Sequence, residues 1–256
     1  MLTIFKFLQK YDHEYIMYYD DLLRPYGDKP AKLVQAVIAD AIEILRKKWC
    51  DHIILPPVRE LVFRDQKEIL PLFQTYLSQY CLSHSLVGKV GLIGDRSDLQ
   101  VAQPLLETFT QAYTLTPNQQ NTKKFHIPFV RRSKEVQLRK YFLTTLSYAD
   151  PMVNKVIKFD LRYFKDAQVD TIIPLSYGYF NYQTAITKNL NYKNCRFHKL
   201  EKLEKAFNDL LDSSKDTSSY SVHILYTGQK ELLQRQKKVM RTLQRGKGIE
   251  IQREKV

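Results

Sequence analysis

A short apolar run that ends at two consecutive prolines constrains the fold of this chain most strongly. Residues 53–55 (Ile-Ile-Leu) follow a stretch with helical periodicity and are closed by Pro56 and Pro57. Apolar runs bounded in this way are typical of a fully buried parallel strand, and we predict one over residues 51–58. In open parallel sheets, ligands bind just beyond the carboxyl ends of such strands. The two prolines offer no nucleophile, acid or base at that point.

Strands and helices are expected to alternate along the rest of the chain. A helix that starts at Pro30 should bury one stripe of side chains, consisting of Val34, Val37, Ile38, Ala41, Ile42, Leu45 and Trp49. Apolar or β-branched runs predict further strands at 15–19, 87–94, 125–130, 169–175, 195–198 and 222–226. Helical spacing predicts helices at 72–81, 98–113, 134–148, 152–165 and 200–211, and a final helix from Gly228. This alternation favours an α/β fold with parallel sheets that helices cover on both faces.

The composition is that of a folded protein with a large positive charge. Of the 256 residues, 44% are hydrophobic and 12% aromatic, and the formal net charge is +13. No apolar run approaches the ~20 residues needed to span a bilayer, and the first residues do not resemble a signal peptide. We therefore expect a cytoplasmic protein without a membrane partner. Three cysteines without CxxC spacing and six scattered histidines indicate neither a disulfide framework nor a metal site, and we expect no cofactor.

Much of the positive charge lies in residues 230–255, where nine Lys or Arg accompany three Glu. In the predicted final helix, one face carries Lys237, Lys238, Arg241 and Arg245, opposite an apolar face. Such a face suits the phosphate backbone of nucleic acid, although it lacks the interleaved aromatic side chains of single-strand binders. We favour a packed helix with a solvated basic side, and nucleic-acid binding stays an alternative.

Three stretches of the chain together carry a resemblance to a known enzyme family. They are YYDDLLRPYGDK at 18–29, IILPPV at 53–58 and DTIIPLSYG at 170–178. Their order and spacing resemble the cofactor-independent glutamate racemases of the aspartate/glutamate racemase superfamily, over about residues 14–245. The resemblance implies an α/β fold with two pseudo-symmetric domains, the first formed by 1–86 plus 209–256 and the second by 87–208. It also makes a homodimer an open expectation.

The residues that carry the family's chemistry are replaced in this chain. The racemases remove the Cα proton of an amino acid with one cysteine and return a proton to the other face with a second cysteine. Pro56 stands at the first cysteine position and cannot carry a proton, and Ser176 stands at the second, where its hydroxyl is too weak an acid without an activating base. The polar pair after each cysteine is replaced as well, by Pro57-Val58 and by Tyr177-Gly178.

The sequence therefore predicts a glutamate racemase-like protein without catalytic residues, which binds a small anionic ligand or acts as a regulatory or binding protein. The resemblance offers five ligand-binding candidates, namely Asp20, Tyr26, Gly27, Ser176 and Tyr177. Each has a plainer interpretation: Tyr26-Gly27 as a tight turn, Asp20 as a loop or cap residue, and Ser176 as a hydrogen-bond partner of the backbone. Two alternatives stay open, an active member of the superfamily that uses residues other than cysteine, and a basic nucleic-acid-associated protein.

Overall fold

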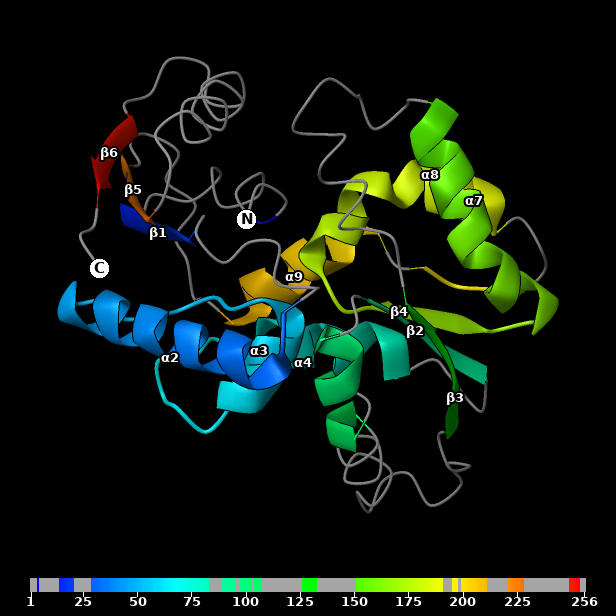
Figure 1. The fold of residues 1–256 in the computed structure, drawn as a ribbon, viewed down its shortest axis with the longest axis horizontal. Coiled ribbons are helices and arrows are strands. Elements are labelled where there is room, and N and C mark those ends of the chain that lie inside the picture. The colour runs from blue at the N-terminus through cyan, green and yellow to red at the C-terminus, as the bar shows by residue number, and fades with distance from the viewer. Residues whose placement is uncertain are drawn as a thin grey trace.

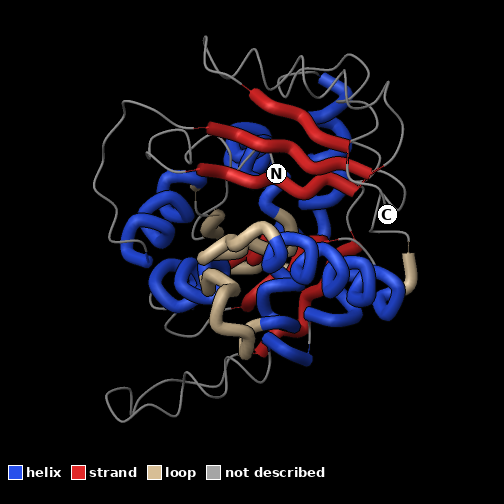
Figure 2. Tube along the Cα trace, turned by 90° about the vertical axis from the view of Figure 1, so that its left-hand side faces the viewer, coloured by secondary structure: helices blue, strands red, loops and turns tan. Residues whose placement is uncertain are grey.

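Two separate three-stranded parallel sheets form the framework of the protein (Figure 1). The computed structural model describes residues 4, 14–20, 29–82, 89–94, 97–102, 104–106, 126–132, 151–190, 195–197, 199–210, 221–227 and 249–253. In the first sheet, β1 (Glu14–Asp20) pairs with β5 (Ser221–Thr227), and β5 pairs with β6 (Ile249–Arg253). Segments from the two ends of the chain thus share one sheet, whose strands lie side by side in Figure 2.

The second sheet is built from the middle of the chain. Its central strand β2 (Lys89–Gly94) pairs with β3 (His126–Arg132) on one side and with β4 (Thr171–Pro174) on the other. These strands confirm the predictions for 87–94, 125–130 and 169–175, as β1 and β5 confirm those for 15–19 and 222–226. The predicted strand at 195–198 is a single bridge between Arg196 and Thr171, and β6 was not expected.

The helices follow the apolar periodicity of the sequence. They are α2 (Ala31–Lys47), α3 (Pro57–Phe63), α4 (Leu72–Tyr76) with the π-helical turn η2 (Leu77–Leu82), α7 (Pro151–Asp166), the 3-10 helix η4 (Tyr177–Tyr182), α8 (Gln183–Asn189) and α9 (Leu200–Leu210). Residues 97–102 and 104–106 are also helical. The helices predicted at 134–148 and from Gly228 lie outside the described residues. No described helix has both the length and the apolar character that a membrane crossing requires.

The strand predicted over 51–58 is wrong in extent and in kind. Ile53 forms only an isolated parallel bridge with Ile69, and helix α3 begins at Pro57. The prolines explain the change, because neither has an N–H to donate to a strand ladder. Pro57 suits the first position of a helix, where that N–H has no partner in any case. The apolar residues are nevertheless buried, since Ile53 and Leu55 pack against the inner face of α2.

Apolar side chains cover the second sheet on both faces. Leu92 and Ile173 belong to a cluster with α3, α4 and α9, whereas Ile93 and Ile172 point into a cluster with α7 and α8. Alternate residues of a strand face opposite sides, so β2 and β4 each contribute to both clusters. Gly91 lets α7 approach closely, because a Cβ atom there would lie 2.8 Å from the Phe164 ring. The carboxyl edge of this sheet is therefore held firmly between two layers of helices.

Helices α2 and α7 end in the same way. After each, a residue adopts a left-handed conformation, Trp49 with φ 59° and Gln168 with φ 51°. In α2 the amides of Trp49 and Cys50 return to the carbonyls of Arg46 and Leu45, which is the Schellman arrangement. This turn corrects one prediction, because Trp49 leaves the buried stripe of α2 and is 91% exposed.

Candidate functional site

The two catalytic positions implied by the resemblance lie at helix starts. Pro56 is exposed and precedes α3, and its carbonyl accepts hydrogen bonds from the amides of Arg59 and Glu60, both at 2.9 Å. Ser176 precedes η4, and its Oγ accepts a hydrogen bond from the Gly178 amide at 3.2 Å. Neither position carries a thiol, and the one hydroxyl serves to cap a helix.

Glu60 is a functional candidate that the sequence analysis missed. It follows Pro56 by four residues, and its side chain is 0% exposed. Oε2 accepts a hydrogen bond from the Phe73 amide at 2.7 Å and Oε1 accepts one from the Gln74 amide at 2.9 Å. These amides belong to the first turn of α4, which Pro71 precedes and cannot cap with its side chain. Glu60 thus supplies from α3 the cap that α4 lacks.

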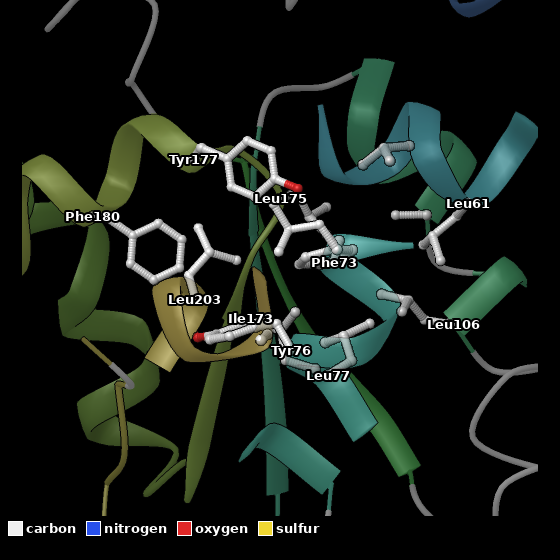
Figure 3. Packing of buried hydrophobic residues seen from close by; sticks show 14 of the residues in the cluster. Leu61, Phe73, Tyr76, Leu77, Leu106, Ile173, Leu175, Tyr177, Phe180 and Leu203 are labelled. Carbon is white, nitrogen blue, oxygen red and sulfur yellow. The ribbon is translucent and has the colours of Figure 1, made fainter. Parts of the chain in front are cut away.

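Tyr177 reaches this carboxylate from the other catalytic position. It follows Ser176, is 5% exposed and belongs to the same apolar cluster as Phe73 and Leu175. Figure 3 shows its ring extending from η4 toward the helices that carry Leu61 and Phe73. The Tyr177 hydroxyl and the Glu60 carboxylate each shift the pKa of the other. The hydroxyl makes no hydrogen bond that meets the usual distance and angle limits. The chain segments that follow positions 56 and 176 therefore meet through Glu60 and Tyr177.

Burial dominates the acidity of both groups. It raises the pKa of the Glu60 carboxyl from its usual 4.5 to about 7, against a smaller lowering by the amides of Phe73 and Gln74 and by Tyr177. Burial also raises the pKa of the Tyr177 hydroxyl well above its usual value, and the negative charge of Glu60 adds to this effect. Near neutral pH, Glu60 is thus a carboxyl that titrates while Tyr177 stays neutral.

A buried ion pair joins α3 to the segment after β2. The Arg59 side chain is 2% exposed, and its Nη2 donates to Oδ1 of Asp98 at 2.8 Å. The other terminal nitrogen, Nη1, is buried without a hydrogen-bond partner. Such a guanidinium depends on the Asp98 carboxylate, because an uncompensated buried charge is strongly unfavourable.

These contacts place α3 on the carboxyl edge of the second sheet. Strands β2 and β4 are parallel neighbours, and the Leu175 amide donates to the Ile93 carbonyl at 2.9 Å just beyond their last paired residues. Arg59 reaches the segment after β2, and Glu60 reaches the segment after β4. This is the edge at which an open parallel α/β protein binds its ligand. The sequence feature that could have indicated this site is the charged pair Arg59-Glu60, which lies in the otherwise apolar first turn of α3.

The remaining predicted site residues are not brought to this edge by the described structure. Asp20 is the last residue of β1 and pairs in register with Thr227, but its side chain is not described. Tyr26 and Gly27 lie outside the described residues, as do the tail residues Lys237, Lys238, Arg241 and Arg245. Among the described residues, no group of three or more His, Cys, Asp or Glu is arranged to hold a metal ion.

The sheets and the helices that cover them define a parallel α/β protein. Glutamate racemase RacE1 from Bacillus anthracis matches with a TM-score of 0.71 at 14% identity, over 100% of this chain and 93% of the racemase. The Campylobacter jejuni glutamate racemase matches with 0.71 at 13% identity, over 96% of this chain and 95% of that one. The Francisella tularensis enzyme in complex with D-glutamate matches with 0.67 at 16% identity, over 99% and 93%.

This chain has the glutamate racemase fold, which confirms the resemblance seen in its sequence. The likeness extends over nearly the full length of both proteins, so it includes both sheets. No protein-family model and no curated protein matches the sequence. At these identities the likeness establishes the fold, and the function must be argued from the site.

Proposed function

We propose that this is a glutamate racemase-like protein that has lost racemase catalysis and works by binding. The proposal is carried by one observation: the segments after both catalytic positions are closed onto each other by the buried contact between Glu60 and Tyr177. Tyr177 stands where the resemblance places a threonine, so an aromatic ring occupies the core where the family has a small polar residue.

Neither catalytic position offers a base for a Cα proton. Pro56 has no ionisable group, and Ser176 accepts a hydrogen bond from the backbone. A serine hydroxyl needs an adjacent general base to act on a weak carbon acid. The carbonyl of Pro56 is also occupied, since two amides of α3 donate to it. These local roles support helix starts, not proton transfer.

Glu60 is the one described group near these positions with a pKa suited to acid–base work, so it favours the alternative of an active enzyme without cysteines. Three features count against that role. Each carboxylate oxygen of Glu60 accepts a hydrogen bond from a backbone amide of α4, and the Glu60 side chain is fully buried. These two hydrogen bonds also cap the start of α4. Structural groups of this kind also have perturbed pKa values. We therefore assign Glu60 a structural role.

The binding role has two parts. The first is the binding of a small anionic ligand by Asp20, Tyr26, Gly27, Ser176 or Tyr177. D-glutamate is the ligand to test first, because the Francisella tularensis racemase structure contains it. The second is a regulatory or binding role toward a macromolecule. The tail residues Lys237, Lys238, Arg241 and Arg245 keep nucleic acid as an alternative partner, and a cytoplasmic setting and a homodimer stay expectations.

We also infer that the two sheets are the centres of two pseudo-symmetric domains, 1–86 plus 209–256 and 87–208. Two facts support this division. Strands β1, β5 and β6 come from the two ends of the chain, whereas β2, β3 and β4 come from its middle. In addition, α2 and α7 end in the same left-handed turn, each shortly before one of the two catalytic positions.

Solvent deuterium incorporation at Cα tests the loss of catalysis most sensitively. The full chain is incubated in deuterated buffer with D-glutamate, L-glutamate and aspartate in turn, and Cα labelling is followed by proton NMR. We expect no labelling above the protein-free background. Labelling that disappears in Ser176→Ala or in Glu60→Gln would establish the active alternative and name its base. Calorimetric titration with D-glutamate on the same sample tests the binding of a small anion separately.

A further inference from the structure

One fully buried carboxyl joins three elements at the carboxyl edge of the second sheet. Glu60 belongs to α3, and its side chain is 0% exposed. Its two oxygens accept hydrogen bonds from the Phe73 and Gln74 amides of α4, at 2.7 and 2.9 Å. Tyr177 of η4 faces the same carboxyl with its hydroxyl. Helices α3, α4 and η4 therefore meet at a single ionisable group.

Among the described residues, no positive charge compensates this carboxyl when it ionises. The groups that face it are the two backbone amides of α4 and the Tyr177 hydroxyl, and all of them are neutral near pH 7. Arg59 precedes Glu60 in α3, but its guanidinium pairs with Asp98 at 2.8 Å. A buried carboxylate without a cation is unfavourable, so the closed arrangement favours the protonated carboxyl. Burial accordingly raises the pKa of Glu60 to about 7.

Helix α4 depends on its neighbours for support. It has only five residues, and Pro71 before it offers no side-chain cap. A helix of this length is not stable by itself. Its ring contact with η4 does not depend on charge, since Tyr76 meets Phe180 edge to face at 5.7 Å (Figure 3). The part of α4 that responds to the charge of Glu60 is thus its first turn, where the two capped amides lie.

We propose that Glu60, the first turn of α4 and Tyr177 form a proton-operated latch, which is closed while Glu60 is protonated and opens locally when Glu60 ionises. Opening lets water reach the carboxylate, which removes the cost of a buried charge. It also parts the segments that follow positions 56 and 176, because α3 and η4 begin there. The latch thus couples the proton on Glu60 to access at the carboxyl edge of the second sheet.

The direction of this coupling follows from the two states of Glu60. In the closed latch its pKa is about 7, whereas in the open latch the carboxyl meets water and returns to its usual 4.5. The closed latch is therefore most stable below pH 4.5, loses stability as the pH rises to about 7, and changes little above. Between these values the ratio of open to closed latch should rise about tenfold for each pH unit.

The latch regulates the edge at which the proposed binding role is placed, so it rests on that proposed function. A ligand that parts the same segments should release the Glu60 proton. The test of the latch uses no ligand, so a failed latch leaves the loss of catalysis untouched. Labelling of an amino acid at Cα would overturn that loss whatever the latch does.

Amide hydrogen exchange of the full chain, followed by NMR, tests the latch residue by residue. Protection of the Phe73 and Gln74 amides is measured from pH 5 to pH 8 and corrected for the intrinsic effect of pH on exchange. We expect it to fall about fiftyfold over this range. Low urea should leave these two amides unchanged, because a local opening exposes little surface. It should speed exchange at Ile157 and Leu161 of α7, which pack in the other cluster and report global unfolding.

Two variants separate the parts of the latch. Glu60→Gln cannot ionise and leaves one α4 amide without an acceptor, so protection should be low at every pH and no longer vary with pH. Tyr177→Phe removes a hydroxyl that lowers the pKa of Glu60, so protection should continue to fall above pH 7. Glu201→Gln, at an exposed position in α9, should match the parent. Circular dichroism checks that each variant keeps the fold.

Four results would overturn the latch. The first is constant protection of Phe73 and Gln74 from pH 5 to pH 8 in the parent chain. The second is a response of these amides to urea that equals that of α7, because the opening would then be global unfolding. The third is a pH dependence that survives in Glu60→Gln, and the fourth is a Tyr177→Phe profile identical to that of the parent.

Discussion

Replacing Glu60 by Gln should remove most of one pH-dependent contribution to the stability of this protein. In the folded chain, burial raises the pKa of Glu60 from 4.5 to about 7. Between these values the folded state holds a proton that the unfolded state releases. The free energy of unfolding therefore falls as pH rises through this window, and the contribution of Glu60 is lost above pH 7. At about 1.4 kcal/mol for each pH unit of difference, the loss amounts to about 3 kcal/mol.

Glutamine is neutral like the protonated carboxyl, but its side-chain nitrogen only donates and cannot accept the second of the two α4 amides. At pH 5, Glu60→Gln should thus be less stable than the parent, because one α4 amide loses its acceptor. At pH 8 the parent holds a buried carboxylate and the variant does not, so the difference in stability between them should have shifted by about 3 kcal/mol toward the variant compared with pH 5. Urea unfolding followed by circular dichroism at several pH values between these limits measures this difference.

The matched control is Glu201→Gln, because Glu201 is exposed in the first turn of α9. Its difference from the parent should not grow with pH. A constant offset between Glu60→Gln and the parent from pH 5 to pH 8 would refute the reasoning. It would show that burial does not raise the pKa of Glu60 in the folded chain.

Two further predictions concern side chains outside this contact. Asp98→Ala leaves the Arg59 guanidinium buried and unpaired, so it should destabilise the protein by about 3–5 kcal/mol, and adding Arg59→Met should recover much of the loss in a urea double-mutant cycle. A loss below about 1 kcal/mol in Asp98→Ala would mean that water compensates the guanidinium. Trp49→Gly should raise stability by about 1 kcal/mol, because Trp49 is exposed at a left-handed position, and Gln168→Gly provides the same test after α7. A lower unfolding midpoint in both glycine variants would contradict this.

Most of the strands could be predicted from the sequence because their signals are local. Residues 14–20, 89–94 and 221–227 are β-branched or apolar runs of strand length, and each is a strand. The run at 53–55 carries the same signal, but two prolines turn the chain into α3 before a ladder can form. Strand β6 was missed because its alternation, Ile249 and Ile251 between polar residues, is short and lies in a strongly charged tail.

The candidate site was predictable only in part. The resemblance located positions 56 and 176 and showed that both cysteines were replaced. It could not show that Glu60 caps α4 or that Tyr177 reaches the same carboxylate, because these contacts join residues that are far apart in the sequence. The prediction that Trp49 belongs to the buried stripe of α2 was wrong for a related reason. The apolar spacing in the sequence extends to residue 49, but the backbone there has already left the helix in a left-handed turn.

Restoring both cysteines tests the central claim most directly, which is that Glu60 and Tyr177 close the two catalytic segments onto each other. The variant Pro56→Cys with Ser176→Cys returns a thiol to each position but leaves the Tyr177 ring in the core. Its Cα deuterium labelling of D- and L-glutamate is compared with that of the parent, after circular dichroism and urea unfolding show that it folds. We predict no labelling above background in either chain. Labelling of glutamate by the double-cysteine variant, with Tyr177 and Glu60 unchanged, would contradict the account, because it would show that only the two thiols were missing.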